Sequence, residues 1–107
     1  MTKLKQLLWI NLLLLVAACT TIDYVGNSYT PTKKVDVFFD ERDIDRDYEV
    51  IGKAIGEGVS MDGVKDKMIE RAKREGADAV LIEGISSDMI APDEVRKRIG
   101  ASFLRYR

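Results

Sequence analysis

The longest apolar run of this 107-residue sequence, from Leu7 to Ala18, ends directly before the only cysteine, Cys19. Two lysines precede the run, and a basic start, an apolar stretch and small residues before a cut are the parts of an export signal. A transmembrane helix is the alternative, but it needs roughly 20 apolar residues, whereas this run has about 12 and is interrupted by Asn11. The pattern therefore predicts a signal peptide over residues 1–18 and limits folding to the 89 residues that follow.

The residues at the predicted cut are Val16, Ala17, Ala18 and Cys19, and these four resemble the lipobox of bacterial lipoproteins. The resemblance implies that the Cys19 thiol carries a diacylglyceryl group and the new N-terminus a further acyl chain, and more than one chain gives stable membrane anchoring. A buried, inert thiol is the alternative for a lone cysteine. Thr20 stands where an aspartate would resemble the inner-membrane retention signal of enteric lipoproteins, so we expect the outer membrane, facing the periplasm.

The predicted mature chain has few chemical means of stabilising itself. Without Lys3 and Lys5 it carries 15 basic and 18 acidic side chains, a net charge of −3. With Cys19 modified, neither a disulfide nor a cysteine-based metal site can form. A domain of this size must therefore rely on good packing, on a partner or on self-association.

The first part of the mature chain is polar. Residues 19–32 predict the lipidated N-terminus and a flexible tether, because Thr20 to Thr32 is rich in Thr, Ser and Asn and contains Gly and Pro. Docking of Tyr24, Val25 and Tyr29 on the domain is the alternative to a free tether. Residues 33–107 are expected to form one α+β periplasmic domain.

That domain begins with two predicted strands separated by a charged loop over residues 40–47. Val35 to Phe39 alternates apolar and polar residues, which is typical of a strand. Tyr48 to Val59 has the β-branched content of a second strand. Its glycines predict a bulge or close contact with a neighbouring backbone; they are Gly52, Gly56 and Gly58.

The hydrophobic period then changes to that of a helix. Met61 to Glu75 places its apolar residues on one helical face, Ser60 or Asp62 can cap its start, and Gly76 ends it. Residues 78–82 predict a buried strand and residues 98–107 a final strand. The 84–97 segment between them predicts a long connection, with one helical turn opened by Pro92. The order is β-β-α-β-β, a small α+β fold with one helix packed on one sheet.

The charged loop contains the pattern of a calcium-binding loop, in Asp43, Asp45 and Asp47. The rest of that pattern is missing, because position 6 is Tyr48 instead of Gly and position 12 is Ala54 instead of a bidentate Glu. These aspartates are weak metal candidates, and a solvated, self-paired loop is the preferred interpretation.

The sequence favours a protein without catalysis. It has no histidine, which excludes Ser-His-Asp and Cys-His sites. Ser86, Ser87 and Asp88 offer nucleophiles with no base other than a lysine, and no phosphate-binding loop is present. We expect no cofactor, and no nucleic-acid partner because an exported, net-acidic domain rarely meets one.

Charged and apolar side chains are unevenly placed. Residues 40–49 hold six acids and two arginines, while residues 96–107 hold five basic residues and no acid. Pairing between these two segments, each exposed pair contributing little, is preferred over a partner contact. The apolar run Met89-Ile90-Ala91-Pro92 is expected to fold back onto the core, with an exposed partner patch as the alternative.

The stretch from Val35 to Ile82 also carries a resemblance. Val35-Asp36-Val37-Phe38-Phe39 is followed by Tyr48-Glu49-Val50-Ile51-Gly52 and by a helix that ends in Arg71 to Val80 with Gly76-Ala77-Asp78-Ala79-Val80. This order resembles the RcsF-like and YbjQ-like small envelope domains. The resemblance implies a fold and a compartment, with envelope stress sensing or maintenance as the associated role. The chain departs from RcsF-like sensors in lacking their disulfides and their long proline-rich tether.

Together these features predict a lipid-anchored cell-envelope protein that acts as a non-catalytic interaction module. Its expected partners are the membrane, through acylated Cys19, and an envelope protein or a second copy of itself. A periplasmic lipoprotein that binds a small ligand or cation through the 40–47 carboxylates is the alternative.

Overall fold

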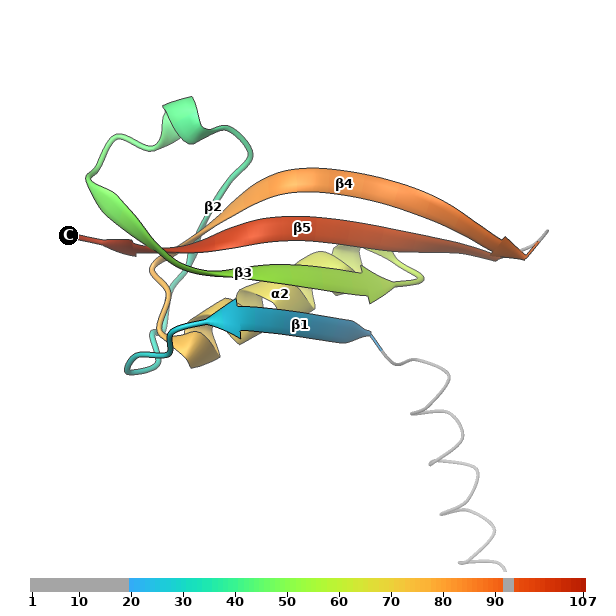
Figure 1. The fold of residues 1–107 in the computed structure, drawn as a ribbon, viewed down its shortest axis with the longest axis horizontal. Coiled ribbons are helices and arrows are strands. Elements are labelled where there is room, and N and C mark those ends of the chain that lie inside the picture. The colour runs from blue at the N-terminus through green and yellow to red at the C-terminus, as the bar shows by residue number, and fades with distance from the viewer. Residues whose placement is uncertain (1–19, 92–93) are drawn as a thin grey trace, which may run out of the picture.

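The computed structural model describes residues 20–91 and 94–107, and in this part of the chain one α-helix packs on one face of a five-stranded mixed sheet (Figure 1). The sheet order is β1-β3-β5-β4-β2. The strands are β1 (Thr21–Gly26), β2 (Asp36–Phe38), β3 (Tyr48–Gly58), β4 (Ala79–Ala91) and β5 (Glu94–Tyr106); the helix is α2 (Met61–Glu75) and a 3₁₀ turn, η1, spans Glu41–Asp43. The predicted α+β class and β-β-α-β-β order are confirmed, with β1 added in front.

Helix α2 has the predicted bounds because its ends and its apolar face are both encoded locally. The Ser60 hydroxyl accepts a hydrogen bond from the Gly63 N–H at 3.3 Å, which caps the first turn. At the other end Gly76 adopts a left-handed backbone, φ 83°, and its N–H donates to the last carbonyls of the helix. Val64, Met68 and Ala72 are buried against the sheet.

The core lies between α2 and the facing side chains of β3, β4 and β5. Phe103 and Ile99 on β5 are almost completely buried there, with Val80 on β4. Gly56 on β3 lets the helix approach closely, because a Cβ at this position would lie 2.8 Å from Cγ1 of Val64. The glycines of β3 were predicted to mark a bulge or a close contact with a neighbouring backbone: the bulge is found beside Gly52, where the register with β5 shifts, whereas the close contacts at Gly56 are with side chains.

The predicted tether is wrong between Thr21 and Gly26, where the chain forms the edge strand β1 paired antiparallel with β3. Tyr24 stacks on Phe103 with ring centroids 4.9 Å apart, so the docking alternative holds for this residue. Gly52 makes room for it, since a Cβ there would lie 2.4 Å from the Tyr24 hydroxyl. In β1 only alternate residues face the core, so the strand contains polar as well as apolar residues. Its sequence therefore resembles that of a polar linker.

The predicted long connection over residues 84–97 is also wrong, because β4 and β5 continue as an antiparallel hairpin. The two strands extend past the ends of β1 and β3, where no helix covers them (Figure 1). Because neither face is buried there, the sequence lacks the alternation of apolar and polar residues that would have predicted a strand. Met89 does not fold back onto the core, since 74% of its surface is exposed. The helical turn expected at Pro92 lies outside the described residues.

In the described residues no helix is long and apolar enough to cross a membrane.

Candidate functional site

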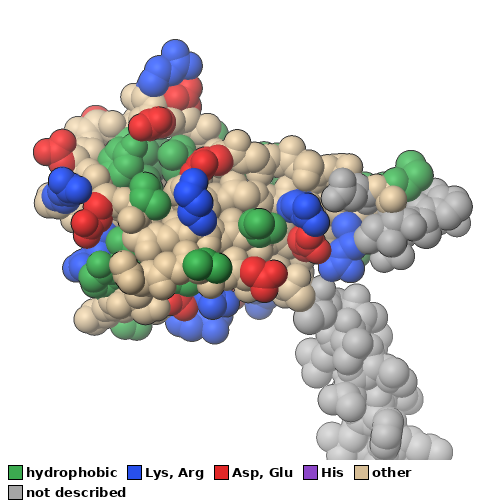
Figure 2. Space-filling model, in the orientation of Figure 1, with side chains coloured by type: hydrophobic (Ala, Val, Ile, Leu, Met, Phe, Trp, Pro, Cys, Tyr) green, Lys and Arg blue, Asp and Glu red, His purple; other side chains and the backbone are tan. Residues whose placement is uncertain are grey.

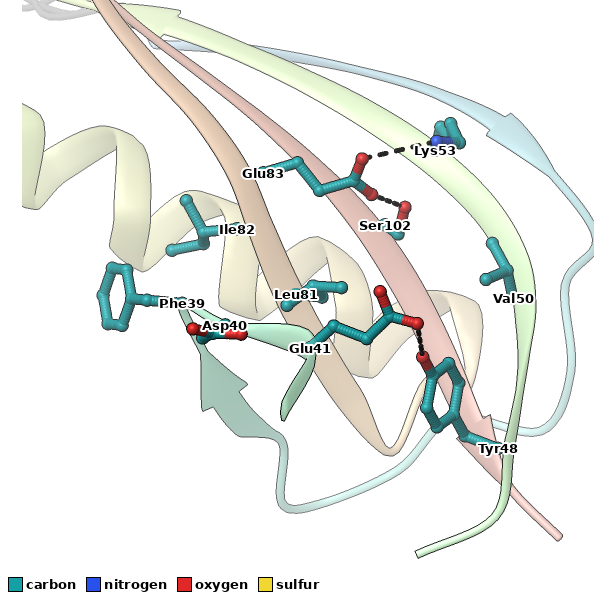
Figure 3. Close-up of a pocket in the computed structure, with 10 residues that line it drawn as sticks. All are labelled: Phe39, Asp40, Glu41, Tyr48, Val50, Lys53, Leu81, Ile82, Glu83 and Ser102. Carbon is teal, nitrogen blue, oxygen red and sulfur yellow. Dashed lines mark hydrogen bonds and ion pairs between the residues drawn. The ribbon is translucent and has the colours of Figure 1, made fainter. Parts of the chain in front are cut away.

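The face of the sheet that α2 leaves uncovered carries a hollow of about 410 Å³ (Figure 3). It lies between the β2–β3 loop, which includes η1, and the strands β3, β4 and β5. Its walls come from segments far apart in the sequence: Phe39, Asp40, Glu41, Tyr48, Val50, Lys53, Leu81, Ile82, Glu83 and Ser102.

Two β-bulges shape this hollow. The register between β3 and β5 shifts between Val50 and Gly52, so Ile51 is buried in the core while Val50 stays on the helix-free face. The register between β4 and β5 shifts between Ile82 and Gly84, at Glu83. A bulge inserts one residue and redirects the side chains beside it. Both shifts therefore bring side chains to the hollow that a regular strand would place elsewhere.

Apolar side chains form part of the wall without being buried. Phe39 is 61% exposed and Val50 is 53% exposed. Figure 2 looks onto this face and shows hydrophobic side chains gathered near the β2–β3 loop, with acidic and basic side chains around them. An apolar surface with a polar rim is the arrangement found in binding sites for proteins.

One polar network crosses the strands at the centre of the face. The Ser102 hydroxyl donates a hydrogen bond to the Glu83 carboxylate, and Lys53 Nζ lies 3.5 Å from the other oxygen of the same group (Figure 3). Lys53 and Ser102 are cross-strand partners in β3 and β5. Ser102 is only 2% exposed, so its hydroxyl orients Glu83 and is poorly placed to attack a substrate.

The β2–β3 loop supplies a second set of paired groups. The Tyr48 hydroxyl donates to Glu41 Oε1 at 3.0 Å, and this hydrogen bond raises the pKa of Tyr48. Asp40 accepts hydrogen bonds from the side chain and the backbone of Arg42, and these lower the pKa of the Asp40 carboxyl. Each carboxylate of the hollow thus has a partner within the protein.

A second hollow of about 180 Å³ adjoins the first, and the two share Lys53 and Glu83. Its floor includes Gly100, which is paired with Gly84 across β5 and β4. A Cβ at either glycine would have no atom within 4 Å. We call the two hollows together the open-face groove. On one side of Lys53 and Glu83 its floor includes Gly100, which has no side chain, and on the other side Phe39 and Val50 form apolar walls.

The structure does not assemble the metal candidates into a site. Asp43 lies at the end of η1, and Asp45 and Asp47 follow in the loop. Among the residues that the structure describes, no three acidic, histidine or cysteine side chains are grouped so that they could hold a metal ion. Cys19, the predicted lipidation site, lies outside the described residues.

The two oppositely charged segments are neighbours, as predicted, but their contacts are of another kind. The Arg46 guanidinium lies 3.9 Å from the centre of the Tyr106 ring, and the Arg107 N–H donates to the Asp47 carbonyl at 3.1 Å. Within the described ranges, the ion pairs of these segments run elsewhere, from Arg98 to Glu57 and from Arg42 to Asp40.

The groove residues Lys53, Glu83 and Ser102 were not candidates in the sequence. They stand on three strands that are adjacent only through the pairing of β3, β5 and β4. No sequence motif links the three residues. Because the strand is irregular at Glu83, the alternation of apolar and polar residues does not predict to which face of the sheet its side chain points. Gly84 and Gly100 were the one available signal, because a glycine within a strand often marks close approach of another group.

No protein-family model matches this chain, and no curated protein matches it. Among solved structures it is similar to the crystal structure of the Francisella virulence factor FvfA, with a TM-score of 0.56 and 17% sequence identity. The match covers 79% of this chain and 98% of the FvfA chain. At this identity the likeness concerns the fold alone: the same arrangement of strands and helix recurs in that protein.

Proposed function

We propose that this chain is a lipid-anchored cell-envelope protein that acts as a non-catalytic interaction module, and that the open-face groove holds a polypeptide segment of its partner. The observation that carries the proposal is the groove itself, which has exposed apolar walls although each of its carboxylates is already paired. Because the carboxylates already have partners, the exposed apolar walls are the part of the groove left without a contact, and this favours recognition of a partner. Exposed apolar walls gain free energy when a partner covers them.

The chemistry of the groove suggests the kind of segment it accepts. Asp40, Glu41 and Glu83 face one lysine, Lys53, inside the groove, so a segment with a basic side chain complements its charge. An apolar side chain of the same segment would cover Phe39 and Val50. A second copy of this chain or another envelope protein can provide such a segment.

The anchor in this proposal is Cys19, acylated after cleavage behind residue 18 and placed in the outer membrane with the domain in the periplasm. The Val16-Ala17-Ala18-Cys19 sequence and the neutral Thr20 support this placement. Cys19→Ser is expected to give an uncleaved precursor without lipid, detected by intact mass. A Cys19→Ser chain that matured normally would contradict the anchor.

Site-specific photo-crosslinking in cells tests the groove. A photoreactive phenylalanine analogue at Val50 or Ile55, which are about half exposed on this face, should form a discrete adduct that mass spectrometry identifies. The matched control is the same analogue at Asp66, an exposed residue of α2 on the other side of the molecule. Equal adducts at all three positions would contradict a specific groove.

Gly100→Val provides a second test, because it fills the groove without disturbing the fold. The new side chain has open space around its Cβ, and a β-branched residue suits a strand. We expect thermal stability to be kept and the adduct at Val50 to be lost. An undiminished adduct in a folded Gly100→Val protein would show that the partner binds elsewhere.

A further inference from the structure

The β4–β5 hairpin and the start of β1 lie at the same end of the molecule (Figure 1). Thr20 sits beside Gly58, since a Cβ on Gly58 would lie 3.0 Å from the Thr20 hydroxyl oxygen, and Gly58 is paired with Lys97. From Lys97 the β5 strand continues back to Glu94, three residues farther. At roughly 3.4 Å per residue, the hairpin reaches about 10 Å beyond Thr20.

This end of the molecule carries exposed apolar side chains. Met89 on β4 and Val95 on β5 are cross-strand partners, and they are 74% and 39% exposed. Ile85 is 54% exposed but lies nearer the body of the sheet, because its partner Ile99 is paired with Gly56, two residues before Gly58. Val59, which directly follows β3, is 61% exposed.

We propose that this hairpin contacts the lipid headgroup layer beside the anchor, with Met89 and Val95 turned into it; the inference rests on the proposed acylation of Cys19. Only Thr20 separates Cys19 from β1, so the sheet is held directly at the membrane surface. The headgroup layer of one leaflet is roughly 5–8 Å thick, less than the hairpin's reach beyond Thr20. A sheet that stands on its anchor therefore places these side chains at lipid.

The charge of the hairpin fits an interfacial position. Its sequence from residue 84 to residue 98 has three acidic and three basic side chains: Asp88, Asp93, Glu94, Arg96, Lys97 and Arg98. A neutral total gives no net attraction to anionic lipid. The contact should therefore form on zwitterionic membranes and depend on apolar burial at headgroup depth.

A single tryptophan reports this contact cleanly. The only tryptophan of the sequence is Trp9, within the predicted signal peptide, so the mature chain contains none. We would purify mature, lipidated Met89→Trp and reconstitute it in phosphatidylcholine vesicles brominated close to the headgroup. The matched control is Val25→Trp, because Val25 is 81% exposed at the opposite end of β1. Val95→Trp is a second reporter in case Met89→Trp does not fold.

We expect the emission of the Met89→Trp protein to shift to shorter wavelength and to be quenched severalfold more than that of the Val25→Trp protein, equally with and without added phosphatidylglycerol. Equal quenching of the two variants in a protein that floats with the vesicles and has the lipidated mass overturns the membrane contact and leaves the anchor intact. A shift that follows protein concentration instead of lipid indicates contact between copies and also overturns it. A mature chain without lipid refutes the anchor and this inference together.

Discussion

At the scale of single residues, Gly76 is the position whose backbone conformation most restricts which amino acid can stand there. Its φ of 83° lies in the left-handed region, and a Cβ there would lie 2.7 Å from the Thr30 carbonyl oxygen. A left-handed conformation costs a residue with a Cβ about 1–2 kcal/mol, and the clash with backbone adds to that. The glycine thus both ends α2 and lets the β1–β2 connection pass against it.

Gly76→Ala should therefore lower the free energy of unfolding by about 2 kcal/mol, measured by urea denaturation. Gly63→Ala is the matched control, because Gly63 lies within α2 and a Cβ there would meet Ser60 at ordinary contact distances from 3.6 Å. That change should leave stability unchanged or raise it by about 0.5 kcal/mol. Equal losses in both variants would contradict the role given to the Gly76 backbone.

Tyr106 gives a prediction in alkaline solution. Burial, followed by the hydrogen bond that its hydroxyl donates to Asp36 Oδ2 at 2.7 Å, raises the pKa of Tyr106 to about 12. Because the folded state holds this proton more tightly than the unfolded state, the stabilisation is complete below pH 10 and is lost as the pH rises toward 12.

Tyr106→Phe should abolish the last step in the ultraviolet titration of the tyrosines and flatten the stability loss above pH 10. Tyr29→Phe, which removes an exposed tyrosine, is the control and should keep that last step. A last step that survives in Tyr106→Phe would contradict this assignment.

At the scale of elements, what could be predicted depended on how much of the signal is local. The sequence of α2 and its flanking residues contains the N-terminal cap, the helical spacing of apolar residues and the glycine that ends the helix. Its bounds could therefore be predicted directly. Strand β1 could not, because the interactions that define it come from Gly52 and Phe103, far along the chain. The open-face groove was hidden for the same reason: it exists only once the register of β3, β5 and β4 is known.

The attachment of β1 can be tested at Tyr24, whose ring stacks on Phe103 and whose hydroxyl donates to the Asn27 carbonyl at 2.6 Å. Tyr24→Ala removes the ring and leaves a void beside Gly52, so we expect a loss of about 3 kcal/mol in chemical denaturation. Tyr24→Phe keeps the stacking and should cost about 1 kcal/mol. If the two variants lose the same amount, the ring does not hold β1.

At the scale of the whole molecule, the connection from β1 to β2 ties the sheet to the end of α2. The Tyr29 N–H donates to the Glu75 carbonyl at 2.9 Å, and the Thr32 N–H donates to the Lys73 carbonyl at 2.9 Å. The Ser28 hydroxyl also donates to the Glu75 carboxylate. These hydrogen bonds hold the β1–β2 connection against the C-terminal end of α2. Glu75 is the ionisable side chain that takes part in this attachment.

That arrangement makes the stability of the protein sensitive to acid through Glu75. The hydrogen bond from Ser28, followed by the hydrogen bond from Arg71, lowers the pKa of Glu75 below 4.5 against an opposing effect of burial. A lowered folded-state pKa means that the stabilisation is present above pH 4.5 and is lost as the pH falls through the folded-state value.

Glu75→Gln should therefore be less stable than the parent at neutral pH, and the difference should shrink to near zero in strong acid, as measured by urea unfolding at a series of pH values. The Arg71 and Glu75 side chains are 3.0 Å apart and largely shielded from water, so the effect should withstand added salt. The control is Glu70→Gln, which breaks an exposed pair with Lys67 and should cost only a few tenths of a kcal/mol. A Glu75→Gln deficit that stayed constant down to strong acid would show that the carboxylate acts through packing and that its charge does not hold the β1–β2 connection against α2.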